Sequence, residues 1–274
     1  MILSPASFED SFANWGELSA ALAQVVLVAT DMDGTLTQDG KFTASLLASL
    51  AQLAAVEIPV VIVTGRSAGW VQGIAAYLPV AGAIAENGGL FFQRGDDTPQ
   101  LLVPIAAIAD HRQQLATLFH QIQHHFPQVQ ESADNRFRLT DWTFDVAGLA
   151  DAELDAIADL CAAAGWGFTY STVQCHLRPA SQDKGPGLAA VVQRYFADAP
   201  LSQVLTVGDS PNDAGLFDPA RFPLSVGVAN VRHYRDRLPH FPRWVTPSPE
   251  AGGFEDLVAT LVASRSRDRH PAAT

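Results

Sequence analysis

The sequence has little cysteine and little positive charge. Among 274 residues there are two cysteines, and 17 lysines and arginines stand against 29 aspartates and glutamates, for a net charge of −12. Cys161 and Cys175 show no CxxC spacing, which argues against a disulfide framework or a thiolate metal site and favours small core residues in a reducing compartment. An acidic protein repels polyanions, so nucleic acid is not an expected partner.

Long apolar runs are also missing. No stretch of about 18 apolar residues could span a bilayer, and no basic segment followed by a long apolar run opens the chain. These absences predict a cytoplasmic protein with no membrane partner, in an oligomeric state that the sequence does not indicate. A hydrophobic content of 48% and a mean hydropathy of +0.10 predict a globular chain with a substantial core.

Short apolar runs alternate with helical patterns through most of the chain. Buried strands are expected at 25–30, 59–64, 80–85, 204–207 and 224–228, with helices at 43–56, 67–77, 185–196 and 253–263. This alternation predicts an α/β fold with a doubly wound, mostly parallel, Rossmann-like sheet. At the ends, an amphipathic helix is expected at 7–24 and a frayed basic tail at 265–274.

The middle of the chain follows a different pattern. Segments 136–146 and 168–177 alternate polar and apolar residues as half-exposed strands do, and each follows a helical stretch, at 108–126 and 151–164. We expect an inserted α/β cap at 93–182, within a discontinuous core formed by 1–92 and 183–274.

Two carboxylates follow the first predicted strand. Asp31 and Asp33, with Gly34 after them, stand at the carboxyl end of a parallel strand, where such folds place their ligands. An Asp carboxylate can attack phosphorus, and a second acid can do acid/base work. An acidic turn or a calcium loop would also contain DxDG, but the calcium loop requires Glu at its twelfth position, which is Phe42 here.

Three more stretches supply complementary chemistry. Thr64 and Gly65 end the second strand before a helix, where a hydroxyl and backbone amides can bind phosphate, although such a Thr is often only a helix cap. Lys184 precedes another helix and is either a surface charge or the fixed cation that an anionic site needs. Asp209, Asn212 and Asp213 follow a third strand and offer oxygen ligands of the kind Mg²⁺ prefers, or helix caps.

Taken in order, these stretches resemble the four signature motifs of the haloacid dehalogenase superfamily. The matching stretches are DMDGT at 31–35, Thr64-Gly65, Lys184-Gly185 and GDSPND at 208–213. The insertion and Glu86-Asn87-Gly88-Gly89 resemble the subgroup that contains Cof-like, sucrose-phosphate and mannosyl-phosphoglycerate phosphatases, the group called IIB.

This resemblance implies a function and a set of roles. Asp31 would be the nucleophile and Asp33 the general acid/base, while Thr64, Gly65 and Lys184 would bind the phosphoryl group. Asp31, the carbonyl of Asp33 and Asp209 would hold Mg²⁺, with Asn212 and Asp213 completing the shell. We expect a phosphatase that acts on a small phosphate ester, by family analogy a sugar phosphate, through a phospho-aspartate on Asp31.

The remaining alternatives concern the reaction and the substrate. Asp33 favours phosphate chemistry over dehalogenation, because a halide leaves without a proton. A phosphosugar mutase or a silent sugar-phosphate binding protein on the same fold stays possible. Polar residues of the cap strands and of two core loops are the candidates for substrate contact: Arg66, Asn87, Arg136, Arg138, Asp141, His176 and Arg178.

Overall fold

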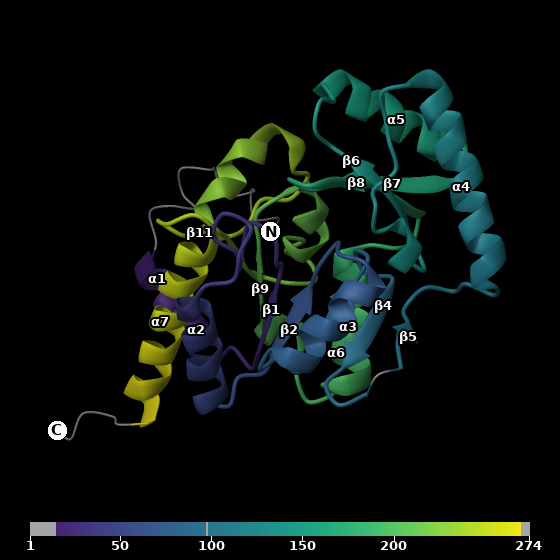
Figure 1. The fold of residues 1–274 in the computed structure, drawn as a ribbon. Coiled ribbons are helices and arrows are strands. Elements are labelled where there is room, and N and C mark those ends of the chain that lie inside the picture. The colour runs from purple at the N-terminus through teal and green to yellow at the C-terminus, as the bar shows by residue number, and fades with distance from the viewer. Residues whose placement is uncertain (1–14, 97, 270–274) are drawn as a thin grey trace.

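The computed structural model of the protein describes residues 15–96 and 98–269. A large sheet with helices on both faces forms one part, and a smaller sheet with two helices stands above it (Figure 1). Of the helix expected at 7–24, the described portion is α1 (Trp15–Leu22), and residues 7–14 lie outside the described ranges. No helix among the described residues has the length and apolar character needed to cross a membrane.

The large sheet has the order β11-β10-β9-β1-β2-β3-β4-β5. The five strands expected from the sequence are all present and pair in parallel, which confirms the predicted fold class. An antiparallel hairpin extends one edge of the sheet. The strands are β1 (Leu27–Thr30), β2 (Val60–Val63), β3 (Gly82–Ala85), β4 (Leu90–Gln93), β5 (Gln100–Leu101), β9 (Val204–Gly208), β10 (Leu224–Gly227) and β11 (Trp244–Val245).

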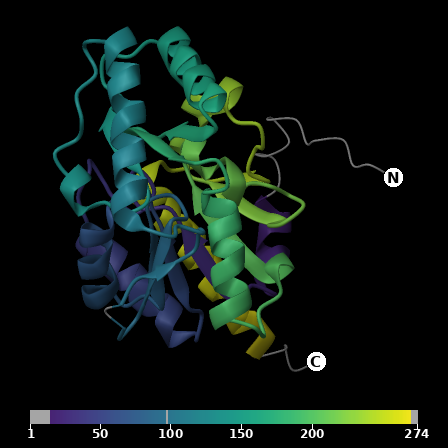
Figure 2. The same ribbon diagram turned by 90° about the vertical axis from the view of Figure 1, so that its right-hand side faces the viewer.

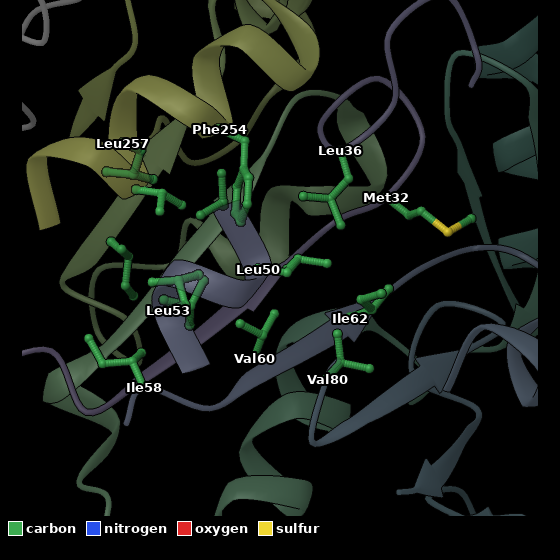
Figure 3. Packing of buried hydrophobic residues seen from close by; sticks show 14 of the residues in the cluster. Met32, Leu36, Leu50, Leu53, Ile58, Val60, Ile62, Val80, Phe254 and Leu257 are labelled. Carbon is green, nitrogen blue, oxygen red and sulfur yellow. The ribbon is translucent and has the colours of Figure 1, made fainter. Parts of the chain in front are cut away.

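Helices cover both faces of this sheet because its strands are apolar on both sides. On one face lie α1, α2 (Ala44–Ala55), α3 (Ala68–Tyr77) and α7 (Glu250–Arg269), whose apolar side chains share a buried cluster with Val60, Ile62 and Val80. Figure 3 shows part of this cluster, with Leu50 of α2 and Phe254 of α7. On the other face lies α6 (Lys184–Tyr195) with short 3₁₀ turns (Figure 2). These turns are η2 (Leu201–Gln203), η3 (Pro211–Leu216) and η4 (Ala229–Arg237).

The smaller part contains an antiparallel sheet of order β6-β8-β7. Its strands are β6 (Trp142–Asp145), β7 (Trp166–Tyr170) and β8 (Gln174–Pro179), and α4 (Ile108–His125) and α5 (Asp151–Ala163) cover one face. Phe119, Phe144 and Ile157 belong to a buried cluster separate from the clusters of the large sheet. Because side chains alternate along a strand, Thr143 and His176, which are paired across the sheet, lie on the face without helices.

Four details differ from the sequence-based expectation. The segment 168–177 is a hairpin and not one strand, because the Ser171 hydroxyl accepts hydrogen bonds from the amides of Val173 and Gln174 and closes a turn. The segment 136–146 is a strand only from Trp142, after the 3₁₀ turn η1 (Asn135–Phe137).

The other differences lie at the segment boundaries. The large sheet continues through β5, so the chain crosses to the smaller sheet after Leu101 and not at residue 93, because β5 pairs with β4. The expected tail at 265–274 is helical as far as Arg269, where α7 ends, and residues 270–274 lie outside the described ranges.

Candidate active site

The site lies where the strand order of the large sheet reverses. β1 lies between β2 and β9. The strands that follow β2 in the chain extend the sheet on one side, and those that follow β9 extend it on the other side. At such a switch point the loops diverge and leave a crevice at the carboxyl ends of the strands. Asp31 follows β1 and Asp209 follows β9, and the amide of Asp31 donates to the carbonyl of Val207 at 2.9 Å.

In an extended segment successive side chains point to opposite sides, which explains why Met32 stands between two acids. Met32 belongs to the buried cluster and lies among its apolar side chains (Figure 3), whereas Asp31 and Asp33 line a pocket. Gly34 then turns the chain with φ +81°, a region that side chains rarely adopt. A Cβ on Gly34 would stand 2.5 Å from Asp209 Oδ2, so the close approach of the two loops also requires glycine.

Lys184 brings a buried positive charge to the candidate site. Its ammonium group is fully buried and donates to Asp31 Oδ1 at 2.5 Å and to Asp213 Oδ1 at 2.7 Å. The other oxygen of Asp213 accepts from the amides of Asp209 and Ser210. Burial alone would lower the pKa of Lys184, but Asp213 and Asp31 together raise it. The lysine is therefore charged, as an anion-binding role requires.

Three carboxylates gather in a group that could hold a metal ion. Asp31, Asp209 and Asp213 are buried and each has an oxygen within 4.8 Å of the others. Asp31 Oδ2 is buried without a hydrogen-bond partner among the described residues. An orphaned carboxylate oxygen beside further acids fits a hard divalent cation, which takes oxygen ligands. The residues present therefore fit the metal that the sequence predicted.

Burial and neighbouring acids raise the pKa values of two carboxyl groups in this cluster. Burial raises the pKa of Asp31 to about 7, although Lys184 lowers it. Burial, Asp31 and Asp213 raise the pKa of Asp209 well above its ordinary value. One ammonium group does not offset three buried carboxylates, so a further cation would stabilise their ionised forms.

Asp33 and Arg66 form a bidentate ion pair at the mouth of the site. Arg66 Nε donates to Asp33 Oδ2 at 2.8 Å, and Nη2 donates to Oδ1 at 2.6 Å. The hydrogen bond with Asp33 raises the pKa of Arg66. Both carboxylate oxygens of Asp33 are thus engaged by one guanidinium group.

A narrow pocket with about 10 Å³ of free space lies between the two parts of the molecule. Residues from the core loops and from the β7–β8 hairpin line it, and none of them is Phe, Tyr or Trp. The lining residues are Asp31, Asp33, Gly65, Arg66, Ser171, Val173, Gln174, His176, Ser210 and Asn212.

The other phosphate-binding candidates lie close by. Thr64 is fully buried, and its hydroxyl accepts from the amide of Arg66. Asn212 donates to Asn87 Oδ1 at 3.0 Å. Asn87 Nδ2 is buried without a partner among the described residues, close to the α-carbon of Gly65. A buried unpaired donor here is available to an anion.

The cap candidates divide into two groups. His176 lines the pocket, and its Nδ1 pairs with Asp141 at 2.8 Å. Arg138 is buried behind it and donates to the carbonyl of Gly65. Arg136 is exposed and lies over the ring of Phe137, away from the pocket lining.

Two further cap residues, Arg178 and Trp142, lie outside the pocket lining and contact other parts of the protein. Arg178 bonds the carbonyl of Gln182 and the carboxylate of Asp183, where the chain returns to the core. Trp142 packs on Phe119 in the cap core and does not line the pocket.

The sequence-based reasoning missed several residues of the site. Asn230 donates to Asp209 Oδ2 at 2.7 Å and to the carbonyl of Gly34, which links the two loops. The sequence contains an indication of Asn230, because this polar residue follows directly after the fifth predicted parallel strand, at 224–228. Ser171 and Gln174 were missed because the hairpin was interpreted as one strand.

The chain is similar to known proteins over most of its length. The family model described as haloacid dehalogenase-like hydrolase matches residues 28–141. A phosphoglycolate phosphatase of Haloarcula marismortui is 31% identical over 238 residues, covering 84% of this chain and 94% of the relative. A phosphoglycolate phosphatase of Methanothrix thermoacetophila is 28% identical over 243 residues, covering 86% and 97%.

Solved structures share the fold. The sucrose-phosphatase of Synechocystis sp. PCC6803 matches with a TM-score of 0.64 at 19% identity, covering 87% of this chain and 98% of that chain. The C-terminal domain of trehalose-6-phosphate phosphatase from C. albicans matches with a TM-score of 0.68 at 14% identity, covering 92% and 97%. The chain belongs to the haloacid dehalogenase-like hydrolases. Within that superfamily it is a phosphatase, an enzyme for small phosphorylated substrates.

Proposed function

We propose that the protein is a Mg²⁺-dependent phosphomonoesterase that forms a phospho-aspartate on Asp31. The observation that carries this proposal is the pairing of Asp31 with buried Lys184 at 2.5 Å while its second oxygen is buried without a partner. Asp31 and Asp209 would hold the metal, with Asp213 oriented by two backbone amides. The metal would neutralise negative charge on the phosphoryl oxygens and carboxylates.

The chain's own residues then divide the reaction into two steps. One carboxylate oxygen of Asp31 attacks phosphorus, the bond between phosphorus and the ester oxygen breaks, and Asp33 gives a proton to the leaving alcohol. Asp33 next takes a proton from water, whose oxygen attacks phosphorus and releases inorganic phosphate from Asp31. Lys184 offsets the repulsion between the attacking carboxylate and the anionic ester.

We also propose a substrate smaller than a disaccharide phosphate. The pocket leaves only about 10 Å³ of free space with the cap in this position, so a small ester needs less outward movement of the cap than a disaccharide phosphate does. Its lining is mostly polar and has no Phe, Tyr or Trp ring on which a sugar could stack. Curated relatives named phosphoglycolate phosphatase agree with a small acidic ester. A sugar phosphate, the class expected from the sequence, would need the cap to move further outward. The two free buried cysteines are consistent with a cytoplasmic location.

The test is phosphate release from a panel of esters, including 2-phosphoglycolate and glucose 6-phosphate, with Mg²⁺ and with EDTA. Asp31→Asn should lower the rate at least 10³-fold, because the amide is not a nucleophile. Asp39→Asn, at an exposed acid in the same loop, is the matched control. Near wild-type turnover by Asp31→Asn would refute the covalent mechanism, and an isomerised sugar phosphate in place of free phosphate would identify a mutase.

A further inference from the structure

Arg66 occupies a position that conflicts with the role proposed for Asp33. Its two nitrogens engage both carboxylate oxygens of Asp33, at 2.8 and 2.6 Å. To give a proton to the leaving alcohol, Asp33 must carry that proton on one of these two oxygens, and an oxygen that carries a proton is a poor acceptor for Arg66. At least one of the two hydrogen bonds from Arg66 therefore has to open during turnover.

When the ion pair between Arg66 and Asp33 opens, Arg66 needs another anion as its partner. The guanidinium lies in the pocket wall with 26% of its side chain exposed, so it is already partly desolvated. Among the described residues that line the pocket, Arg66 is the one with a guanidinium or ammonium group. Leaving it unpaired there would cost free energy, whereas a planar carboxylate can replace Asp33 with the same two hydrogen bonds.

We infer that the substrate carries a carboxylate, and that this group takes Arg66 from Asp33 and so frees Asp33 to reach the leaving oxygen. The inference rests on the proposed function and specifies its substrate as a small phosphorylated carboxylic acid. Esters without the carboxylate leave Arg66 on Asp33 and react slowly. Binding of the substrate carboxylate by Arg66 and release of Asp33 thus occur together.

The cap holds the Arg66 segment in place for this exchange. Arg138 donates to the carbonyl of Gly65 at 2.9 Å while Asp141 holds the same nitrogen of Arg138. His176 is fixed by Asp141 and stands so close to Gly65 that a Cβ there would lie 3.0 Å from its ring. These contacts join the cap to the loop that carries Arg66, beside the pocket.

Trp70 supports Arg66 from the core side. Its ring lies 5.1 Å from the guanidinium carbon, one helical turn along the chain. Trp70 is 49% exposed, so it guides Arg66 without burying it. The guanidinium is therefore held between an aromatic face and the pocket and can change partners with little movement.

The test compares 2-phosphoglycolate with its neutral amide, which has the same size but no carboxylate. Wild-type kcat/KM should favour the acid by roughly 10- to 100-fold, the range for charge-assisted hydrogen bonds. Arg66→Gln should lose this preference, with a fall for the acid and a rise for the amide, because Asp33 is no longer engaged. Arg136→Gln, an exposed arginine on the cap, is the control and should keep the preference.

The wild-type comparison does not depend on whether the variant folds. Equal wild-type kcat/KM for acid and amide, or an equal fall on both esters in Arg66→Gln, would overturn the inference. Hydrolysis of sugar phosphates alone by the wild type would also overturn it while leaving the phosphatase proposal intact. Hydrolysis of no ester at all would instead count against the proposed function.

Discussion

The metal-free protein should lose stability as the pH rises from about 4 to about 7, and Mg²⁺ should restore it. Asp31 has an ordinary pKa of 3.8 in the unfolded chain and about 7 in the fold, mainly because it is buried. Between these values the folded state holds a proton that the unfolded state has lost. The contribution to stability is therefore complete below about pH 4 and lost as the pH approaches 7.

The size of the effect follows from the two pKa values. Each tenfold difference in proton affinity corresponds to about 1.36 kcal/mol, so a pKa of about 7 against 3.8 is worth about 4 kcal/mol. In a chain of this size each kcal/mol moves the melting temperature by roughly 2–4 °C. The Asp31 contribution should thus amount to about 10 °C between pH 4 and pH 7.5 in EDTA.

The assay is thermal unfolding of the wild type and Asp31→Asn across this pH range, with EDTA and with Mg²⁺. Asn keeps the shape of the side chain but does not titrate, so the difference between the two proteins reports the titration of Asp31 together with its effect on Asp209. With EDTA, the wild type should lose more stability than the variant as the pH rises. Parallel pH profiles for the two proteins, or no gain from Mg²⁺ at pH 7.5, would refute the reasoning.

Three further changes test other parts of the structure. Gly34→Ala should lower Mg²⁺-dependent activity, because φ is +81° and the new Cβ would stand 2.5 Å from Asp209 Oδ2; titrating activity with Mg²⁺ should show weaker metal binding. Phe144→Ala should destabilise the cap by about 3–5 kcal/mol, since its ring is fully buried; hydrogen exchange should rise in the cap and not in the large sheet. Arg237→Ala should cost under about 1 kcal/mol, because both acidic partners on α5 are largely exposed, and a melting temperature lowered by 10 °C would contradict this.

Much of the fold and of the site could be predicted because it depends on local patterns. Apolar runs that end in Asp31, Thr64 and Asp209 define parallel strands, and the carboxyl ends of such strands meet at one edge. The convergence of these three strand ends then needs no knowledge of side-chain packing. Lys184 begins α6 and ends no strand of this sheet, so its contact with Asp31 at 2.5 Å, across 153 positions, was predicted from the resemblance of its segment to a family motif.

The less predictable features depend on contacts between distant segments. The hairpin at 168–177 has no Gly or Pro turn signal, and its turn is set by side-chain hydrogen bonds from Ser171. The edge strand β5 has two residues and exists because β4 offers it a partner. The hydrophobic periodicity of a strand or a helix depends on neighbouring residues in the chain and does not indicate such pairings.

The sequence by itself determined the class of sheet, the edge where chemistry gathers and the acids and lysine that gather there, because strand periodicity and strand ends are local properties. Only the tertiary structure decided that Arg66 binds both oxygens of Asp33, that Asn230 joins two loops and that Arg136 stays outside the pocket. Which partner a charged side chain takes depends on three-dimensional distance and burial, and spacing along the chain contains neither.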